Sequence, residues 1–350
     1  MIHMEINVIE SLAVKIPIKK GEEIRRYLSY RNILRKDLKI RKQGDYLLLP
    51  ITNSDEKISF PIVKEKFELH KQKIRSYKDL LTNLGIPLDK FPTSFDIVGD
   101  IILMKIPSEL TEYRNMIGNA LLKVHPHIRS VYNIKPVSGE LRTREVEIIA
   151  GEDRSITIHK EYGALFHIDI AKTFYSPRLA AERRRIVSLV RDEEVILDMF
   201  TGVAPFPVLI AKYANPKKIY AIDKNKEAIS FARRNIAING VEDVVELIQG
   251  DARDIRDILL DTKVDRVIMN LPFSAYKFIP YALKVIKPRA TIHYYDILRE
   301  DSLEKRKREL EDISFKYDFN LYFKDVRKIK TYAPREFYIG MDIMAVKKPM

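Results

Sequence analysis

Residues 195–202 read Val-Ile-Leu-Asp-Met-Phe-Thr-Gly and predict a buried strand that runs into a turn. An apolar run that ends in an acid and is followed by a small-residue loop is typical of a parallel strand with a ligand site at its carboxyl end. Three further strands are expected at 218–223, 244–251 and 265–269, and each leads into a polar residue. The four polar strand ends are Asp198, Asp223, Asp251 and Asn270. The pattern therefore predicts an α/β domain with a ligand site along one edge of its sheet.

The composition indicates a basic protein that contains no thiol. The chain of 350 residues has 62 Lys and Arg against 49 Asp and Glu, a formal net charge of +13. This excess is spread along the chain and suits a polyanionic partner. Cysteine is absent, which excludes disulfides, thiolate metal sites and a cysteine nucleophile. The seven histidines show no metal-ligand spacing, and His125 and His127 flank a proline in a loop-like stretch, so we expect no metal site.

Targeting signals and membrane spans are not recognisable. No apolar run approaches the length of a membrane-spanning helix, and the first residues do not read as a signal peptide. We therefore expect a cytoplasmic protein with no membrane contact. Nothing in the sequence implies a protein partner, so a monomer is the expected state.

The first predicted part, residues 1–62, is a small unit of two strands and one helix. The strands are expected at 13–17 and 46–51, and the helix at 21–30. Residues 31–42, between them, carry six bases and one acid. Such a run is more often a solvated surface than a binding site, so by itself it does not show nucleic-acid binding.

Two larger parts follow. Residues 63–170 predict an α+β middle domain, which begins with a polar stretch, 64–78, that we expect to be a linker leading into a helix. Residues 171–350 alternate strands and helices, which favours a doubly wound sheet with right-handed connections. The last strands are expected at 291–295, 315–317 and 339–346.

A helix with two unusual charges opens the third part. Ser176 and Pro177 predict its start, because Ser caps helices and Pro is tolerated at the first position. The helix is expected to run to about Val190, and helical counting places Arg183 on its apolar stripe and Glu182 on the border of that stripe. A charge on the core side of a helix indicates a turn that overhangs a cleft.

The loop after the first strand bears on the choice of cofactor. A nicotinamide site favours a Gly-x-Gly-x-x-Gly loop that rests a pyrophosphate on a helix N-terminus. This loop has a single glycine, Gly202, and Pro205 and Pro207 lack amide donors. Asp223 can accept hydrogen bonds from both ribose hydroxyls, and Asp251 can accept one from an adenine amino group. The set fits S-adenosylmethionine rather than a dinucleotide.

The fourth strand leads into Asn270-Leu271-Pro272-Phe273. This tetrapeptide resembles the Asn-Pro-Pro-Tyr type motif of methyltransferases that modify a nitrogen of a planar base. An amide side chain can donate to and accept from a nucleobase edge, and proline stiffens the loop. Leucine at the second position makes the match imperfect.

Four segments together resemble the archaeal and eukaryotic tRNA (guanine-37-N1)-methyltransferase family: 174–183, 198–206, 223–225 and 270–272. The similarity extends over essentially the whole chain, and Ser-Pro-Arg-Leu-x-x-Glu-Arg is its most specific part. One departure is Ala204, where the family usually has Gly, and we expect it to narrow the turn near the methionine part of the cofactor. The resemblance implies a class I, Rossmann-like, seven-stranded methyltransferase domain preceded by a small N-terminal domain and an α+β middle domain.

The resemblance also implies roles for individual residues. Glu182 would remove the proton from guanine N1, Arg142 would stabilise the charge that develops on O6, and Asn270 would orient the base. The residues implied to bind S-adenosylmethionine are Phe174, Arg183, Asp198, Phe200, Gly202, Asp223, Lys224, Asp251, Ala252, Asn270, Leu271 and Pro272. Those implied to bind the tRNA substrate are Arg142, Arg178 and Pro272, and the N-terminal unit would contact the tRNA body.

Other interpretations stay open at this point. Without the resemblance, Glu182 would be an ordinary salt-bridge residue of its helix and Arg142 a surface turn residue. Aminocarboxypropyl transfer in the wyosine pathway uses the same cofactor, although residues 176–183 and a separate N-terminal domain favour methyl transfer. Additional methylation of a wyosine intermediate is a further alternative. A non-catalytic tRNA-binding protein is an alternative of another class, but it would not need four polar strand ends.

Overall fold

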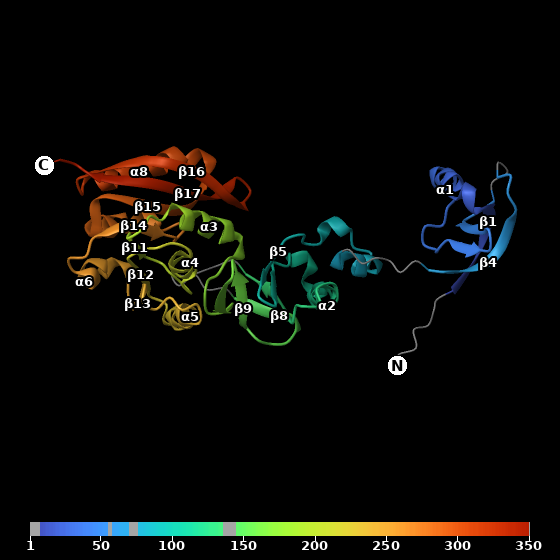
Figure 1. Ribbon diagram of the computed structural model, residues 1–350, viewed down its shortest axis with the longest axis horizontal. Coiled ribbons are helices and arrows are strands. Elements are labelled where there is room, and N and C mark those ends of the chain that lie inside the picture. Colours follow the sequence, from blue (N-terminus) through green and yellow to red (C-terminus); the bar gives the residue numbers. More distant parts are fainter. Residues whose placement is uncertain (1–7, 55–57, 70–75, 136–144, 350) are drawn as a thin grey trace. The chain divides into compact units, whose positions relative to one another are not determined.

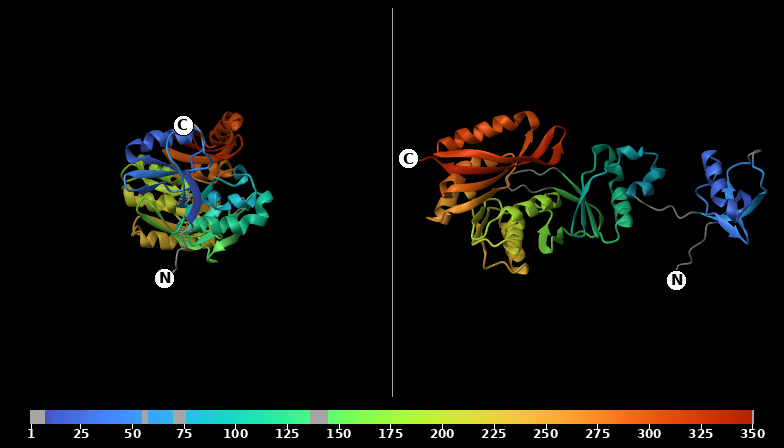
Figure 2. Two further views of the ribbon diagram at one scale, coloured as in Figure 1. Left: turned by 90° about the vertical axis from the view of Figure 1, so that its right-hand side faces the viewer. Right: turned by 45° about the horizontal axis from the view of Figure 1, so that its top comes forward.

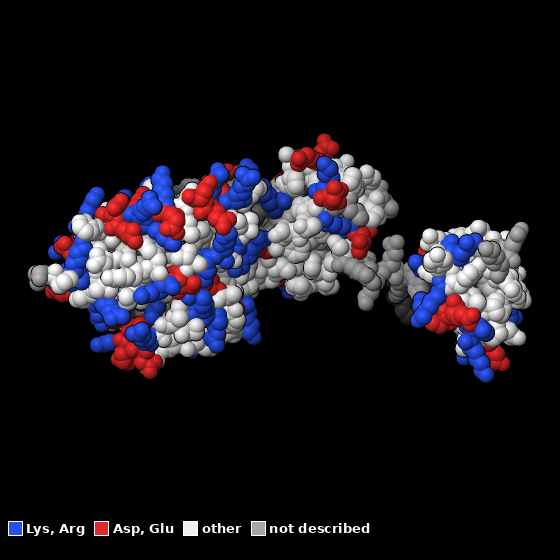
Figure 3. All heavy atoms as spheres, turned by 90° about the horizontal axis from the view of Figure 1, so that it is seen from above, with Lys and Arg blue, Asp and Glu red and all other residues white. Residues whose placement is uncertain are grey.

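The structure is a computed structural model that describes residues 8–54, 58–69, 76–135 and 145–349. The chain divides into two compact units, Met1–Arg75 and Ser76–Met350 (Figure 1). Lys and Arg side chains lie on both units with acidic side chains among them (Figure 3). The basic character is therefore a property of both units.

The first unit is a four-stranded antiparallel sheet with one helix, and its strand order is β2-β3-β1-β4. Its elements are β1 (Val8–Pro17), α1 (Gly21–Tyr30), β2 (Arg41–Gln43), β3 (Tyr46–Ile51) and β4 (Ile62–Glu68). Leu28 of α1 is fully buried and packs in one cluster with Val14 and Leu49 of the sheet. The helix thereby covers one face of the sheet.

Strand β4 differs from the expectation for this stretch. Residues 64–78 were expected to be a linker leading into a helix, yet the stretch begins inside a strand that pairs antiparallel with β1. Its side chains alternate between faces, and the alternation buries Phe67. The first unit was expected to end at residue 62. It extends further, because β4 completes its sheet.

The second unit begins with a small α+β part. Its strand order is β5-β6-β7-β8, and α2 packs on the sheet through Ile117 and Leu121. The elements of this part are β5 (Phe95–Val98), β6 (Ile101–Met104), α2 (Arg114–Val124), β7 (Ser130–Ile134) and β8 (Val146–Gly151). A hairpin of β9 (Ile156–Glu161) and β10 (Ala164–Asp169) follows.

The largest part is a seven-stranded sheet with the order β13-β12-β11-β14-β15-β17-β16. Its strands are β11 (Val195–Asp198), β12 (Lys218–Asp223), β13 (Val245–Gln249), β14 (Val264–Met269), β15 (Ile286–Arg299), β16 (Phe319–Ala333) and β17 (Glu336–Lys347). Strands β11 to β15 run parallel, whereas β17 is antiparallel to both of its neighbours. The predicted doubly wound, seven-stranded sheet is thus confirmed.

Helices cover both faces of this sheet (Figures 1 and 2). Helices α3 (Ala180–Leu189), α4 (Pro205–Tyr213) and α5 (Lys226–Ile238) contribute to one core cluster. Helices α6 (Ile255–Leu259), α7 (Ile279–Val285) and α8 (Leu303–Phe315) contribute to a second cluster. Residues 315–317 were expected to form a strand, but α8 ends at Phe315 and the next strand, β16, begins at Phe319.

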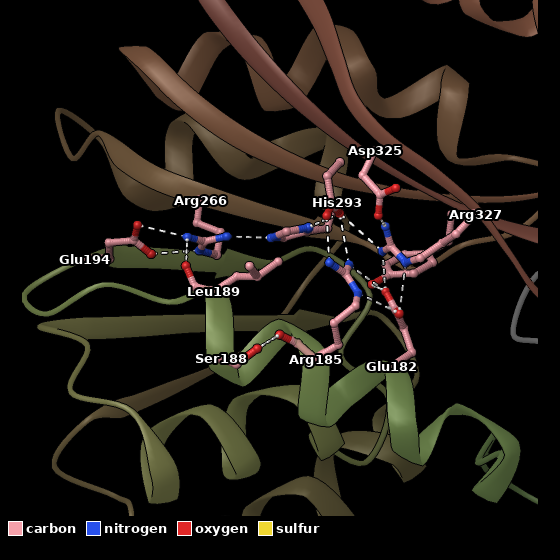
Figure 4. A network of polar contacts seen from close by, with 11 residues as sticks. Glu182, Arg185, Ser188, Leu189, Glu194, Arg266, His293, Asp325 and Arg327 are labelled. Carbon is pink, nitrogen blue, oxygen red and sulfur yellow. Dashed lines mark hydrogen bonds and ion pairs between the residues drawn. The ribbon is translucent and has the colours of Figure 1, made fainter.

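A network of charged groups joins α3 to the C-terminal strands (Figure 4). Glu182 accepts two hydrogen bonds from Arg185 at 2.9 and 3.0 Å, and two from Arg327 of β16 at 2.5 and 3.1 Å. Asp342 of β17 pairs with Arg185 at 2.7 Å and with Arg327 at 3.2 Å. Two carboxylates therefore neutralise two guanidinium groups, which matters because an unpaired buried charge costs several kcal/mol.

The network continues through His293, which is fully buried on β15. Arg266 of β14 lies 2.6 Å from Nε2 of this ring, and Asp342 lies 2.7 Å from Nδ1. Because a guanidinium group can only donate, Nε2 is an acceptor and the Nδ1–H donates to Asp342. Burial lowers the pKa of His293, which favours this neutral form. Arg266 also pairs with Glu194 at 2.7 Å and donates to the carbonyl of Leu189, so the network reaches the end of α3.

We expect Asp342→Asn to destabilise the second unit, because Arg185 and Arg327 would lose a shared carboxylate, which leaves Glu182 to both and the more exposed Asp325 to Arg327. The loss should be about 3 kcal/mol, or roughly 6 to 12 °C in Tm. Differential scanning calorimetry of the full chain at pH 7 measures it. The control is Asp301→Asn, whose side chain is 68% exposed beside Arg299 and should leave Tm nearly unchanged. Equal Tm values for the Asp342 variant and the wild type would contradict the structural role.

Candidate functional site

A cavity of about 560 Å³ opens where the parallel strands β11 to β14 end. Such a volume is typical of a small-molecule or cofactor site. Of the residues implied by the resemblance, the cavity is lined by Phe174, Arg183, Phe200, Gly202, Asp223, Lys224, Asp251, Ala252, Asn270, Leu271 and Pro272. Adjacent parallel strands bring these loops to one edge, as their pattern in the sequence indicated.

Asp223 is held at the sheet edge by backbone donors. Its carboxylate accepts the N–H of Gly202 at 2.7 Å and the N–H of Asn225 at 2.8 Å. Gly202 has a φ of +55°, a conformation that glycine adopts without strain. Burial raises the pKa of Asp223, and the backbone hydrogen bonds oppose this rise. The backbone of Lys224 contributes a further hydrogen bond, so the carboxylate is fixed in orientation at the edge of the cavity.

Asp251 lies at the end of the next strand and forms an ion pair. Arg253 donates to its two carboxylate oxygens at 2.9 and 2.6 Å, and this hydrogen bonding lowers the pKa of Asp251 to about 2. The acid also caps the short 3-10 helix Ala252–Asp254. It stays ionised at neutral pH and can accept a further hydrogen bond from an amino group.

Asp198 lies below the cavity and is not part of its lining. It is fully buried, and burial raises its pKa to about 7. One carboxylate oxygen accepts the N–H of Phe200 at 3.3 Å, whereas Oδ2 has no hydrogen-bond partner in the described part of the chain. Thr201, a lining residue, lies beside this carboxylate, and its side chain opposes the effect of burial on the pKa of Asp198.

The amide of Asn270 is oriented from the opposite side of the cavity. The hydroxyl of Tyr338, on β17, donates to Oδ1 of Asn270. With Oδ1 engaged by this hydroxyl, the amide nitrogen is the donor that can meet an acceptor on a base. Tyr338 was not singled out from the sequence.

Besides Asp198, three predicted residues are not part of the described lining. Arg142 lies outside the described residues. Arg178 pairs with Asp96 and donates to Ser94 at 2.9 Å, so it connects the turn that leads into α3 to the α+β part. Glu182 is buried in the network described above and is not a lining residue.

The hydrogen bonds to Glu182 determine its protonation state. The hydroxyl of Tyr295 donates to it at 2.7 Å, in addition to the donors of Arg185 and Arg327. Burial alone would raise the pKa of Glu182, but these hydrogen bonds outweigh burial and lower the pKa to about 2. In this arrangement Glu182 is a firmly ionised carboxylate.

Arg183 reaches the cavity while it is fixed by the hairpin. It is buried, and it donates to Glu161 at 2.5 and 2.8 Å and to the carbonyl of Ser176 at 3.1 Å. The expected charge on the core side of the helix is therefore present and paired. Its contact with a cofactor stays a prediction.

Sequence reasoning missed the contribution of the C-terminal hairpin. Lys330 and Tyr332 of β16 and Tyr338 of β17 line the cavity. No motif surrounds these residues, and the only available signal was the expectation that the last strands join the same sheet. Their approach to the site follows from the pairing of β17 with β15.

The described part of the chain contains neither a candidate metal site nor a helix suited to a membrane. No group of three or more His, Asp or Glu side chains within the described ranges is arranged to hold a metal ion. Among the helices that the structure describes, none has the length and apolar character needed to cross a membrane.

Three protein-family models match consecutive stretches of the chain. The tRNA methyltransferase 5 N-terminal domain matches residues 13–60, the TYW2 N-terminal domain matches 78–154, and the TRM5/TYW2 methyltransferase domain matches 157–322. The three stretches follow one another without overlap.

Named relatives span most of the chain. The tRNA (guanine(37)-N(1))-methyltransferase Trm5b of Pyrococcus abyssi is 38% identical over 95% of this chain and 98% of its own length. The solved complex of aTrm5 and tRNALeu has a TM-score of 0.74 and 39% identity, over 95% of this chain and 99% of that one. A tRNA(Phe) (4-demethylwyosine(37)-C(7)) aminocarboxypropyltransferase of Methanocaldococcus jannaschii is 33% identical over 70% of this chain and 95% of its own length.

These matches confirm the family and the fold that the sequence predicted. Identity of 38% over nearly the whole of both chains leaves no large part of this molecule without a counterpart in the relative. The chain belongs to the TRM5/TYW2 methyltransferase family.

Proposed function

We propose that this chain methylates N1 of guanosine 37 in tRNA, with S-adenosylmethionine as the methyl donor. The observation that carries the proposal is the cavity that combines Asp223 and Asp251 with Asn270 at the ends of parallel strands. The full-length similarity to an enzyme named for this reaction supports it. We further propose that the protein acts as a monomer in the cytoplasm.

The residues of the cavity fit the proposed cofactor. Asp223 can accept hydrogen bonds from the ribose hydroxyls, and Asp251 can accept one from the adenine amino group. When bound, S-adenosylmethionine supplies a methyl group on a sulfonium centre that a nitrogen lone pair can attack. The protein must then hold the base in line and remove its N1 proton.

Glu182 is the proposed base, on the strength of the family resemblance. A carboxylate with a pKa of about 2 accepts a proton poorly. Proton abstraction by Glu182 therefore requires that Arg327 or Arg185 release it when the RNA binds. Arg142 is the proposed partner of O6, and Asn270 would donate to the base edge.

The nearest rival is aminocarboxypropyl transfer with the same cofactor. The aminocarboxypropyltransferase relative matches only 70% of this chain, whereas the methyltransferase relative matches 95%. The tRNA methyltransferase 5 N-terminal model also matches residues 13–60. Both observations favour methyl transfer to guanine. Methylation of a wyosine intermediate and binding without catalysis are outcomes that the following experiment distinguishes.

The direct test uses methyl-labelled S-adenosylmethionine and two tRNA transcripts, one with G37 and one with A37. We expect label only in the G37 transcript, recovered as 1-methylguanosine. Binding of both transcripts without methyl label would contradict the proposal. Label placed in the amino-acid part of the cofactor would then separate aminocarboxypropyl transfer from silent binding. A transcript that carries the wyosine intermediate tests the additional activity.

A second prediction concerns Glu182. We expect Glu182→Gln to slow methyl transfer by roughly 100- to 10,000-fold, as is usual for the loss of a general base. Single-turnover kinetics measure the rate, and calorimetric titration should show little change in cofactor affinity. The control is Glu304→Gln, since the Glu304 side chain is 71% exposed and pairs with Lys307. Unaltered turnover in the Glu182 variant would remove this residue from the mechanism.

A third prediction separates the two acids of the cofactor side. Asp223→Asn should weaken S-adenosylmethionine binding by about 10- to 100-fold, because a carboxylate that accepts two hydroxyl protons contributes charge-assisted hydrogen bonds. Asp251→Asn should weaken it less, since Arg253 already occupies that carboxylate. Dissociation constants from calorimetry provide the comparison. The reverse order of the two effects would contradict the assignment of Asp223 to the ribose.

A further inference from the structure

Phe273, at the end of the loop that carries Asn270, has an uncommon backbone conformation. Its φ is +71°, in the left-handed region that bulky residues rarely adopt. Such a conformation costs of the order of 1 to 3 kcal/mol and persists only where the surroundings enforce it. The surroundings therefore hold Phe273 in this conformation, and its side chain has a defined position beside the cavity.

The enforcing group is a buried carboxylate behind the loop. Asp296 of β15 is fully buried and accepts the N–H of Phe273 at 2.9 Å. The same carboxylate accepts the hydroxyl of Tyr294 at 2.7 Å and pairs with Arg306 of α8 at 3.0 Å. Oδ1, the oxygen that binds Phe273, also accepts the N–H of Ile297 at 2.8 Å, whereas Tyr294 and Arg306 hold Oδ2. The carboxylate is therefore fixed through both of its oxygens. The position of Phe273 is thus set from inside the fold.

The side chain of Phe273 meets a second exposed aromatic ring at the mouth of the cavity. Phe273 is 48% exposed and Tyr332 of β16 is 47% exposed, and both line the cavity. Their ring centroids lie 5.6 Å apart with an interplanar angle of 75°. No flat molecule fits between rings in this edge-to-face arrangement, so a base would stack on a ring face that points away from the other ring.

The surroundings of the two rings suit an RNA strand. Lys277 and Lys330 line the same cavity and supply positive charge for a phosphate backbone. Proteins that bind single-stranded RNA commonly stack its bases on exposed aromatic side chains near such charges. The combination of two half-exposed rings and two lysines therefore matches a nucleotide better than a lipid or an apolar peptide.

The depth of the rings decides which nucleotide they can meet. Asn270, the proposed contact of the target base, bonds to Tyr338, which is only 2% exposed. Phe273 and Tyr332 are almost half exposed and so lie nearer to solvent than this contact. The geometry points to Phe273 and Tyr332 as a stacking platform for the nucleobase that flanks the target base in the RNA. This inference rests on the proposed function, because it takes the target base to be the one that Asn270 meets.

Fluorescence of 2-aminopurine tests the platform directly. This adenine analogue loses fluorescence when it stacks, and the chain has no tryptophan to interfere. Three tRNA transcripts carry it at the target position or at either flanking position, and each binds the full-length protein with S-adenosylhomocysteine present. We expect quenching at one flanking position, lost in Phe273→Leu and Tyr332→Leu and retained in Phe273→Tyr. Tyr322→Leu is the matched control, because Tyr322 is 45% exposed on the same strand but does not line the cavity.

Kinetics give an independent readout of the same contact. Tyr332→Leu should raise KM for tRNA roughly 5- to 150-fold, the range expected from one base–aromatic stack, with cofactor affinity unchanged. Absence of quenching at both flanking positions, or ring-dependent quenching at the target position alone, would overturn the platform. If the wild type fails to methylate the G37 transcript, the proposed function fails, and that outcome is separate from the fluorescence result.

Discussion

The methyltransferase part depends on the pairing of buried charges between α3 and the C-terminal strands. Glu182, Arg185, Arg327 and Asp342 neutralise one another, and His293 extends the pairing to Arg266. Removal of one charged member leaves its partners with fewer opposite charges in a buried setting, which costs stability. The consequence for the site is geometric: the helix that brings Arg183 to the cavity is fixed to the hairpin that brings Lys330.

The same pairing constrains the chemistry that Glu182 can perform. The hydrogen-bond donors that stabilise the fold also stabilise the ionised form of Glu182. The same hydrogen bonds therefore make Glu182 a weak base. Arg327 lies on β16, the strand that also carries Lys330 and Tyr332 to the mouth of the cavity. A substrate that contacts this strand therefore contacts the element that holds Glu182. If RNA binding released the Glu182 carboxylate from Arg327, this residue could stabilise the free protein and still accept a proton in the complex.

The part of the site that lies at the ends of the parallel strands could be predicted from local sequence patterns. Asp223, Asp251 and Asn270 could be found because each ends a short apolar strand, and parallel strands of one sheet end together. Lys330 and Tyr332 could not be found in this way, since their approach to the site depends on pairing between strands far apart in the chain.

Ala204 was expected to narrow the turn near the cofactor. It has a φ of +63° and is buried in the core, and it does not line the cavity.

The two loops at the centre of the site share a physical feature that explains why sequence motifs describe them incompletely. Ala204 and Phe273 both hold left-handed backbone conformations without glycine. Strain of this kind persists only where other parts of the fold enforce it, as Asp296 does for Phe273. The conformation of the acceptor loop is therefore determined by residues behind the cavity as much as by its own sequence. Substitutions at such supporting positions would alter the chemistry of the site without touching cofactor or RNA.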